Sequence, residues 1–261
     1  MRTIDPFRLE KRVVILTGAA GHYGRTLAAQ IAAAGATLWL ASRDGKALDE
    51  LAVELRERGA DVHTAVFDQG VESSIRDLTQ AVLKKHGRID GLVNNAVFRP
   101  NKAAGAVEPA EAWLNSLKVN AVGLYLLTRT AAESMAETGG GAIVNVASIY
   151  GVVGPSPSFY EGTDMKLGLG DYFFNKGGMI NLTRYFAAQF GARGVRVNCV
   201  SPGGFFNQQP EPFVQRYCQA TYLGRMAGPD DLGGPVVFLL SPAAAYVTGV
   251  NLPVDGGYTA R

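Results

Sequence analysis

The sequence is poor in cysteine and in concentrated charge. Its 261 residues include two cysteines, Cys199 and Cys218, whose spacing fits neither a disulfide framework nor a zinc or redox motif. The formal net charge is +2, and basic residues gather only in short pairs such as Lys84-Lys85. We therefore expect no disulfide, no metal site and no nucleic-acid partner.

Long apolar runs are missing as well. The N-terminal stretch MRTIDPFRLEKR is polar and lacks the apolar core of a secretory signal, and no run approaches the length of a transmembrane helix. We expect a cytoplasmic protein that does not bind a membrane. Repeats, linkers and low-complexity segments are also lacking, and a composition of 47% hydrophobic and 18% charged residues favours one compact domain over residues 1–261.

What the sequence does contain is a regular alternation of short β-branched runs with longer amphipathic segments. Apolar strands separated by helices predict an α/β fold, with a seven-stranded parallel sheet covered by helices on both faces. The expected strands are 13–16, 37–42, 62–67, 89–95, 142–148, 195–201 and 251–255. The expected helices lie near 22–34, 45–58, 71–86, 109–137, around Tyr172 and near 229–240.

Two stretches, 150–170 and 203–228, break this alternation. Both follow expected strands at their carboxyl ends. Open α/β sheets bind ligands at that edge, so we expect these stretches to form irregular segments around a binding site.

A glycine-rich turn directly follows the first expected strand. In TGAAGHYGRTLAAQIAAAG, Gly18, Gly21 and Gly24 precede a helix-forming segment. Glycine lets the backbone approach a pyrophosphate closely, and a helix N-terminus adds aligned N–H donors. Such a turn is ordinary in isolation, but its place at the start of a βαβ unit predicts a dinucleotide-binding site.

The end of the second expected strand indicates which dinucleotide is bound. NAD sites usually place a carboxylate there for the ribose 2′-hydroxyl, whereas an arginine fits the 2′-phosphate of NADP. The sequence LASRDG provides Ser42 and Arg43, which favours NADP(H) and leaves NAD(H) as the alternative. Arg43 could instead be a surface residue paired with Asp44 or Glu50. Asp68, after the third strand, either accepts a hydrogen bond from the adenine amino group or begins a turn.

Tyr172 and Lys176 form a candidate catalytic pair. They stand four positions apart in DYFFNKGGM, so on a helix they share one face. A phenol has a pKa of about 10 and exchanges protons poorly near neutrality unless a cation such as the Lys176 ammonium stabilises its phenolate. Ser148, at the end of the apolar run GAIVNVAS, adds a hydroxyl at a strand end. The alternative is a chance pair, with a half-buried tyrosine and a solvated lysine.

These segments together resemble the short-chain dehydrogenase/reductase family, in its short single-domain branch. The resemblance covers nearly the whole chain and implies a Rossmann-type doubly wound fold, nicotinamide chemistry on a carbonyl or alcohol, and a homotetramer or homodimer. The matching segments, in the family's order, are TGAAGHYG, Asp68, Asn94-Asn95-Ala96, Asn120 in LKVNAVG, Ser148, YFFNK, the SPGG at 201–204 and VTGVNLPVDGGYTA.

The resemblance also implies roles for individual residues. Tyr172 would be the general acid in carbonyl reduction or the base in alcohol oxidation, and Lys176 would lower its pKa and hold the nicotinamide ribose. Ser148 would bind the substrate oxygen, or only end a strand. Asn120 would interrupt its helix and hold a water linked to Lys176, or only cap a turn. The residues expected at the cofactor are Gly18, Gly21, His22, Tyr23, Gly24, Ser42, Arg43, Asp68, Asn94, Asn95, Ala96, Tyr172, Lys176, Pro202, Gly203 and Asn207.

Several positions depart from the family pattern. His22 replaces a glycine, so the spacing G-x-x-G-x-x-G is that of the family's extended branch. Val97 replaces the usual glycine after Asn-Asn-Ala, and Asn207 stands where a threonine often contacts the nicotinamide amide. The largest departure is the separation of Ser148 from Tyr172, which is about twice the family's usual one.

We interpret residues 151–170 as an inserted loop that walls the substrate site; a surface or subunit contact is the alternative. Tyr160 lies near the usual distance from Ser148, but its neighbour at i+4 is Asp164. A carboxylate raises the pKa of a phenol, so Tyr160 is a poor catalyst.

The segment 203–228 indicates the substrate class. It mixes aromatic side chains with amides and charged groups, which suits a polyhydroxylated, sugar-like substrate better than a long alkyl chain. This segment and the inserted loop also resemble short-chain dehydrogenases of bacterial surface-sugar pathways. Arg99 and Lys102, after the fourth strand, are candidates to bind a phosphate or carboxylate of the substrate, or else form a solvated rim pair.

We therefore expect an NADP(H)-preferring oxidoreductase acting on a small polar molecule. A second hypothesis is a non-catalytic dinucleotide-binding sensor or scaffold, which loss of Tyr172 or Lys176 would have favoured. A third is a sugar-nucleotide epimerase or dehydratase, which the glycine spacing suggests. That chemistry normally needs an added C-terminal substrate domain, whereas this sequence ends after the seventh expected strand.

Overall fold

The computed structural model describes residues 5–99, 110–167 and 170–260. Their strands form one parallel sheet of seven, in the order β3-β2-β1-β4-β5-β6-β7, as the sequence predicts. The order reverses between β1 and β4, which is the place where doubly wound sheets bind dinucleotides. The strands are β1 (Val13–Thr17), β2 (Thr37–Ser42), β3 (Val62–Val66), β4 (Gly91–Asn94), β5 (Gly141–Val146), β6 (Val195–Pro202) and β7 (Asn251–Val254).

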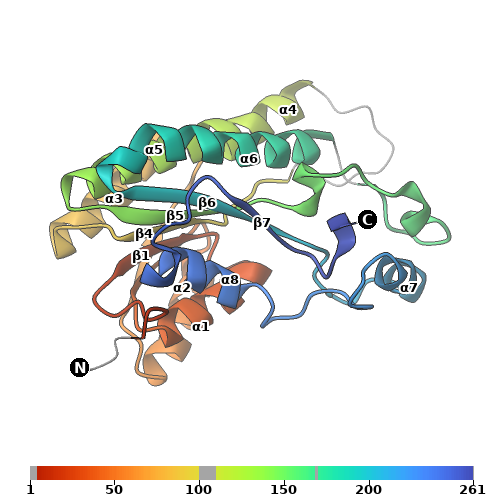
Figure 1. Cartoon of the computed structure of the whole chain (residues 1–261), viewed down its shortest axis with the longest axis horizontal. Helices are drawn as coiled ribbons and strands as arrows, with labels where there is room; N and C mark the ends of the chain where they lie inside the picture. The colour runs from red at the N-terminus through yellow and green to blue at the C-terminus, as the bar shows by residue number, and fades with distance from the viewer. Residues whose placement is uncertain (1–4, 100–109, 168–169, 261) are drawn as a thin grey trace.

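Helices cover both faces of the sheet (Figure 1). One layer consists of α1 (His22–Ala33), α2 (Gly45–Glu57) and α8 (Gly233–Leu240). The opposite layer consists of α3 (Glu72–His86), α4 (Ala110–Leu117), α5 (Leu124–Glu137) and α6 (Gly170–Phe190). Helix α7 (Glu211–Gln219) lies to one side of the sheet, near the C-terminus (Figure 1).

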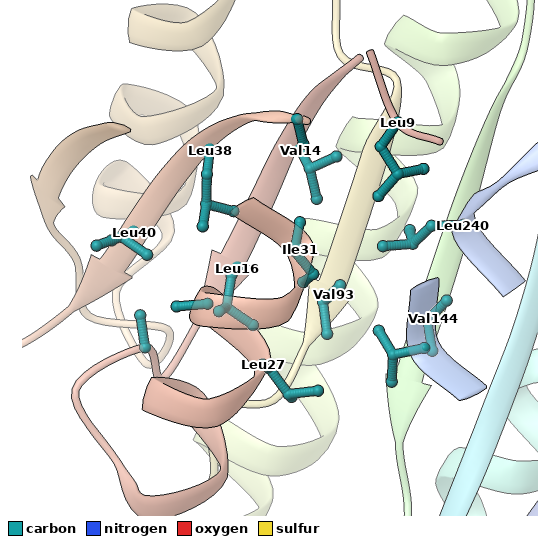
Figure 2. Close-up of a cluster of buried hydrophobic side chains, with 14 of the residues drawn as sticks. Leu9, Val14, Leu16, Leu27, Ile31, Leu38, Leu40, Val93, Val144 and Leu240 are labelled. Carbon is teal, nitrogen blue, oxygen red and sulfur yellow. The ribbon is translucent and has the colours of Figure 1, made fainter. Parts of the chain in front are cut away.

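The two helical layers bury separate apolar clusters against the sheet. All five residues of β1 are buried, because side chains on both faces of the strand meet a helix. On the face of α1, Leu27 and Ile31 point toward Val14 and Leu16 of the sheet (Figure 2). They lie four residues apart and therefore occupy the same side of the helix. This packing holds the carboxyl edge of the sheet in place.

Two elements differ from the sequence-based expectation. The segment expected as one helix over 109–137 is interrupted by a π-helical turn, η1 (Lys118–Gly123), which the predicted break at Asn120 anticipates. The stretch 203–228 was expected to be irregular but contains α7. Phe213 and Tyr217, one turn apart, are the buried residues of this helix. No helix in the described part of the chain is long and apolar enough to cross a membrane.

Candidate active site

A cleft of about 1030 Å³ runs along the carboxyl edge of the sheet. It extends from the glycine-rich turn after β1 to the first turns of α6. Its lining includes Gly18 and Arg43 toward one end and Ser148, Tyr172 and Lys176 toward the other. The strand ends therefore bring the candidate dinucleotide turn and the candidate catalytic groups into one cavity, as expected for a doubly wound sheet.

Helix α6 presents Tyr172 and Lys176 from consecutive turns. Lys176 is 5% exposed, and its Nζ donates a hydrogen bond of 2.5 Å to the carbonyl oxygen of Val146, the last residue of β5. This bond fixes the ammonium at the strand end, 5.7 Å from the centroid of the Tyr172 ring. The phenol and the ammonium thus face the same cavity, and the alternative of a solvated lysine is wrong.

The charges around Tyr172 set the acidity of its hydroxyl. Burial alone would raise the pKa of Tyr172, but the positive charges of Lys176 and Arg99 and hydrogen bonds with Ser148 and Arg99 outweigh it. The net result is a pKa below the ordinary value for tyrosine. The pKa of Lys176 is also lowered, chiefly by burial. A phenol in this setting can exchange a proton with a bound oxygen more readily than a free tyrosine.

Ser148 joins this pair despite the long intervening loop. It follows β5, is buried, and caps the short 3₁₀ turn Ile149–Gly151 by accepting a hydrogen bond of 3.1 Å from the Tyr150 amide. Its hydroxyl also hydrogen-bonds with Tyr172. Although many residues separate them in the sequence, Ser148 and Tyr172 line the same cleft. Ser148 therefore does more than end a strand.

Asn120 lies in the π-helical turn η1 and is held by the segment that follows β4. Its amide nitrogen donates to the Phe98 carbonyl (2.7 Å), and its Oδ1 accepts from the Phe98 amide (2.8 Å). The Asn120 side chain therefore bonds outside its helical segment as well as within it, and the water expected to link it to Lys176 remains a prediction. The side chain thus couples the α4–α5 segment to the residues that line the middle of the cleft.

A buried polar network that the sequence did not indicate supports this region. The Ser116 hydroxyl accepts from the side-chain amides of Asn120 (3.0 Å) and Asn175 (3.1 Å). Its single proton is therefore donated to Asp171, with which it forms a close hydrogen bond. Ser116 and Asp171 are 0% and 2% exposed. An aspartate directly before Tyr172, at a buried helical position, is the signal that could have identified the network.

The glycine-rich turn has the geometry of a phosphate cradle. Gly18 has a φ of +64°, and a Cβ there would lie 2.8 Å from the Cα of Ala96. Asn95 closes the turn by donating to the carbonyls of Thr17 (3.1 Å) and Gly18 (3.0 Å). Helix α1 begins after Gly21, and no side chain caps its first turn, so its free N–H groups suit a pyrophosphate.

The other residues expected at this turn divide into two groups. His22 and Tyr23 line the cleft, and the Tyr23 hydroxyl donates to the Gly203 carbonyl (3.1 Å). Gly24 is buried behind the turn, where a Cβ would collide with the Gly18 carbonyl. Its expected place at the cofactor is corrected to a packing role. The Asn94 side chain bonds within the core, which leaves the backbone of Asn94 for the expected contact with the cofactor.

The adenosine end of the cleft contains Ser42, Arg43 and Asp68. The alternative partner for Arg43, Asp44, instead caps α2 by accepting from the Ala47 amide (3.0 Å). The Oδ1 atom of Asp68 accepts from the Gly70 amide (2.8 Å), so this aspartate begins a turn while its carboxylate also lines the cleft. These residues lie at the end of the cleft where a doubly wound sheet holds the adenosine ribose.

The far wall of the cleft joins the inserted loop to the segment 203–228. The Tyr150 and Tyr160 hydroxyls lie 3.4 Å apart, and the Tyr160 ring meets Phe213 of α7 edge-on. Arg216 of α7 donates to loop carbonyls, including that of Ser158 at 3.1 Å. Ala96, Pro202, Gly203 and Asn207 line the same cavity. Lys102 lies outside the described residues, and the described residues contain no group of three or more metal-ligating side chains.

Comparisons with known proteins agree with this site. Residues 18–259 match the family model described as enoyl-(acyl carrier protein) reductase. The chain is 31% identical to a 7α-hydroxysteroid dehydrogenase of Bacteroides fragilis (97% of this chain, 96% of the relative). It is 33% identical to an L-tagatose-forming galactitol 2-dehydrogenase of Cereibacter sphaeroides (97% of each).

Its structure also resembles that of a gluconate 5-dehydrogenase from Burkholderia cenocepacia in complex with NADP and tartrate. The TM-score is 0.87 at 30% identity, over 98% of each chain. A family model that spans almost the whole chain, dehydrogenase relatives at this level of identity, and the cleft chemistry agree. The chain belongs to the short-chain dehydrogenase/reductase family and is an oxidoreductase that uses a nicotinamide cofactor.

Proposed function

We propose that this protein interconverts an alcohol and a carbonyl group of a polar, sugar-like substrate, with a preference for NADP(H). The observation that carries the proposal is the convergence of Tyr172, Lys176 and Ser148 at one end of a cleft whose other end is a glycine-rich phosphate cradle. A nicotinamide nucleotide, when bound, gives or takes the hydride. The chain's own residues must hold the substrate and move the proton.

The proton transfer is assigned to Tyr172. In carbonyl reduction its hydroxyl protonates the substrate oxygen, and in alcohol oxidation its phenolate removes the hydroxyl proton. Lys176 favours the phenolate by its charge, and it is in turn held by the Val146 carbonyl. Ser148 donates to the substrate oxygen where negative charge develops. Asn120 positions the segment after β4 through Phe98.

The preference for NADP(H) is supported by the residues after β2. Arg43 lines the cleft, while the neighbouring carboxylate of Asp44 is engaged in capping α2. An arginine can bind a ribose 2′-phosphate through its planar fork, and an occupied carboxylate is less able to accept from a 2′-hydroxyl. Asp68 is proposed to accept from the adenine amino group, and Asn207 to approach the nicotinamide amide.

The sugar-like substrate is supported by the composition of the far wall. Residues 151–170 and 203–228 supply tyrosine hydroxyls and amides beside aromatic faces. Hydroxyl-rich molecules bind such walls through hydrogen bonds at their edges and packing on their flat faces. The galactitol and gluconate dehydrogenases among the similar proteins act, by their names, on molecules of this class. A place in a bacterial surface-sugar pathway remains a prediction.

A homo-oligomer is also proposed, with its contact on the outer face of α4 and α6. Leu114 and Phe174 are 65% and 60% exposed there, and the Phe174 ring lies 5.8 Å from that of Trp113. Val122 of η1 and Tyr185 of α6 are also exposed. Contiguous exposed apolar side chains commonly mark a subunit contact. Light scattering should give a mass that is a multiple of the 27.7 kDa chain.

Replacement of Tyr172 by phenylalanine tests the proposal. Phe keeps the ring but removes the hydroxyl, so turnover in a screen of keto-sugars and polyols should fall by about 1000-fold or more. NADPH binding, followed by fluorescence, should change by less than about threefold, because the pyrophosphate cradle is intact. Retained turnover in Tyr172→Phe would move the proton transfer to another group.

A further inference from the structure

Arg99 is the charged group closest to Tyr172 that the proposed reaction does not yet use. Its guanidinium carbon lies 4.3 Å from the centroid of the Tyr172 ring, nearer than the Lys176 ammonium at 5.7 Å. Unlike the buried Lys176, Arg99 is solvent-exposed, and it lines the cleft on the substrate side of the ring. It can therefore contact a bound molecule directly.

The backbone beside Arg99 is anchored. The preceding residue, Phe98, forms two hydrogen bonds with the Asn120 side chain, of 2.7 and 2.8 Å. Asn120 is in turn bonded to the buried Ser116. The start of the Arg99 side chain is thus fixed by a network that reaches into the core, and its head extends from that fixed point over the catalytic ring.

The guanidinium has no acidic partner among residues 5–99, 110–167 and 170–260. Three carboxylates in these ranges line the cleft: Asp171 is bonded to Ser116, Asp68 to the Gly70 amide, and Asp164 forms no ion pair with Arg99 within 4.0 Å. Arg99 instead lies over an aromatic face. An arginine held in a cleft in this way has donors available for a ligand, and its planar fork matches a carboxylate bidentately.

We propose that Arg99 recognises a carboxylate on the substrate, close to the carbon that reacts, so that the preferred substrate is a sugar-derived hydroxy or keto acid. The reacting oxygen is held by Tyr172 and Ser148, and the guanidinium lies beside the same ring. A carboxylate attached within a carbon or two of the reacting carbon falls within its reach. The fork also matches a phosphate, so the test includes a phosphorylated ligand. This inference rests on the proposed function, because it uses the same cleft.

The test compares molecules that differ only at one end. D-Gluconate and D-glucitol share five carbons and their hydroxyls and differ only at C1, which is a carboxylate in one and a CH₂OH group in the other. D-Glucitol 1-phosphate places a phosphate at the same end. Calorimetry on the protein saturated with NADP⁺ gives the dissociation constants. The wild-type protein should bind D-gluconate at least about tenfold more tightly than D-glucitol, since charge-assisted hydrogen bonds discriminate at about this level.

Variants assign the effect to Arg99. Arg99→Gln should reduce the preference for D-gluconate over D-glucitol to less than about threefold. Arg99→Lys keeps the charge but not the planar fork, so its preference should lie between those of the wild-type protein and Arg99→Gln. Lys166→Gln is the matched control, because Lys166 lines the same cleft and its loss changes the net charge equally. It should keep the preference. NADPH affinity should be unchanged in all three variants, which shows that they fold.

Several results would overturn the proposal: no binding of D-gluconate by the wild-type protein, equal binding of D-gluconate and D-glucitol, tighter binding of the phosphate, or an unchanged preference in Arg99→Gln. An equal loss in Lys166→Gln would also overturn it, because it would assign the effect to overall charge. Carboxylate binding through Arg99 without turnover of any alcohol or ketone would sink the proposed function instead. Turnover of neutral ketones without carboxylate preference would sink only the present inference.

Discussion

The two ends of the cleft are built in different ways. The cofactor end is made of backbone: a left-handed glycine, free N–H groups at the start of α1, and asparagine bonds to main-chain carbonyls. The substrate end is made of side chains contributed by α6, α7 and the loop over 151–170. A backbone site tolerates almost no substitution at its tightest points, whereas a side-chain site can change its ligand by single replacements. We therefore expect mutations to act differently at the two ends.

The largest effect is expected at Gly18, where the backbone end is tightest. In Gly18→Ala the new Cβ would lie 2.8 Å from the Ala96 backbone, at a φ of +64°. NADPH affinity should fall by about 10- to 100-fold, measured by fluorescence titration. Gly59→Ala is the control, because it has a similar φ of +84° and nothing within 4 Å. Both variants should lose about 1 kcal/mol or more of stability from backbone strain. If Gly18→Ala and Gly59→Ala bound NADPH equally well, the glycine-rich turn would not be the phosphate-binding site.

An intermediate effect is expected at Arg43, the side chain proposed to favour NADP(H). Arg43→Gln should weaken NADPH binding about 10-fold or more and leave NADH binding within about threefold, because only NADPH carries the 2′-phosphate. Lys46→Gln, on the exposed first turn of α2, removes the same charge and should leave both affinities unchanged. A parallel loss for both nucleotides in Arg43→Gln would assign Arg43 a general electrostatic role.

The smallest effect on turnover is expected at Ser116, which lies behind the cleft and bonds Asp171 and Asn175 of α6 and Asn120 of η1. Ser116→Ala leaves Asp171 and two asparagine amides short of a buried partner, so stability should fall by about 1–3 kcal/mol in denaturant unfolding. Turnover should fall by only about 3- to 10-fold, because Asn120 keeps its bonds to Phe98. Thr79→Val is the control: it removes a buried hydroxyl of α3 and should lower stability without changing turnover. Wild-type stability in Ser116→Ala would mean that the network is not structural.

The comparison also explains what the sequence could predict. The seven strands, the glycine turn and the spacing of Tyr172 and Lys176 are local patterns, and the strands were predicted with nearly the right boundaries. The packing of Gly24 behind the turn and of the Asn94 side chain in the core could not be predicted, because each depends on which way a Cβ or side chain faces. The same holds for the Ser116–Asp171 bond and the stacking of Arg99 on Tyr172, which join segments far apart in the chain. Helix α7 was missed because Phe213 and Tyr217, which lie four residues apart, were interpreted as the aromatic lining of a pocket formed by an irregular segment.

The central claim is that cations next to Tyr172 make its phenol acidic. For alcohol oxidation the phenolate is the active form, so activity should rise with pH and level off below the ordinary tyrosine pKa of about 10. Removing the ammonium in Lys176→Met should raise the pKa of Tyr172 and move this rise to higher pH. Residual turnover in Lys176→Met will be low, so the titration itself is the better measurement.

The most direct measurement is the ultraviolet titration of phenolate, taken as the difference between the wild-type protein and Tyr172→Phe, which isolates one of the ten tyrosines. The same difference is then taken in a Lys176→Met background. In the wild-type background we predict that the phenolate of Tyr172 forms with a midpoint at a pH below the pKa of free tyrosine. In the Lys176→Met background the midpoint should lie at a clearly higher pH. A midpoint at or above the free value in the wild-type background, or the same midpoint in both backgrounds, would contradict the account.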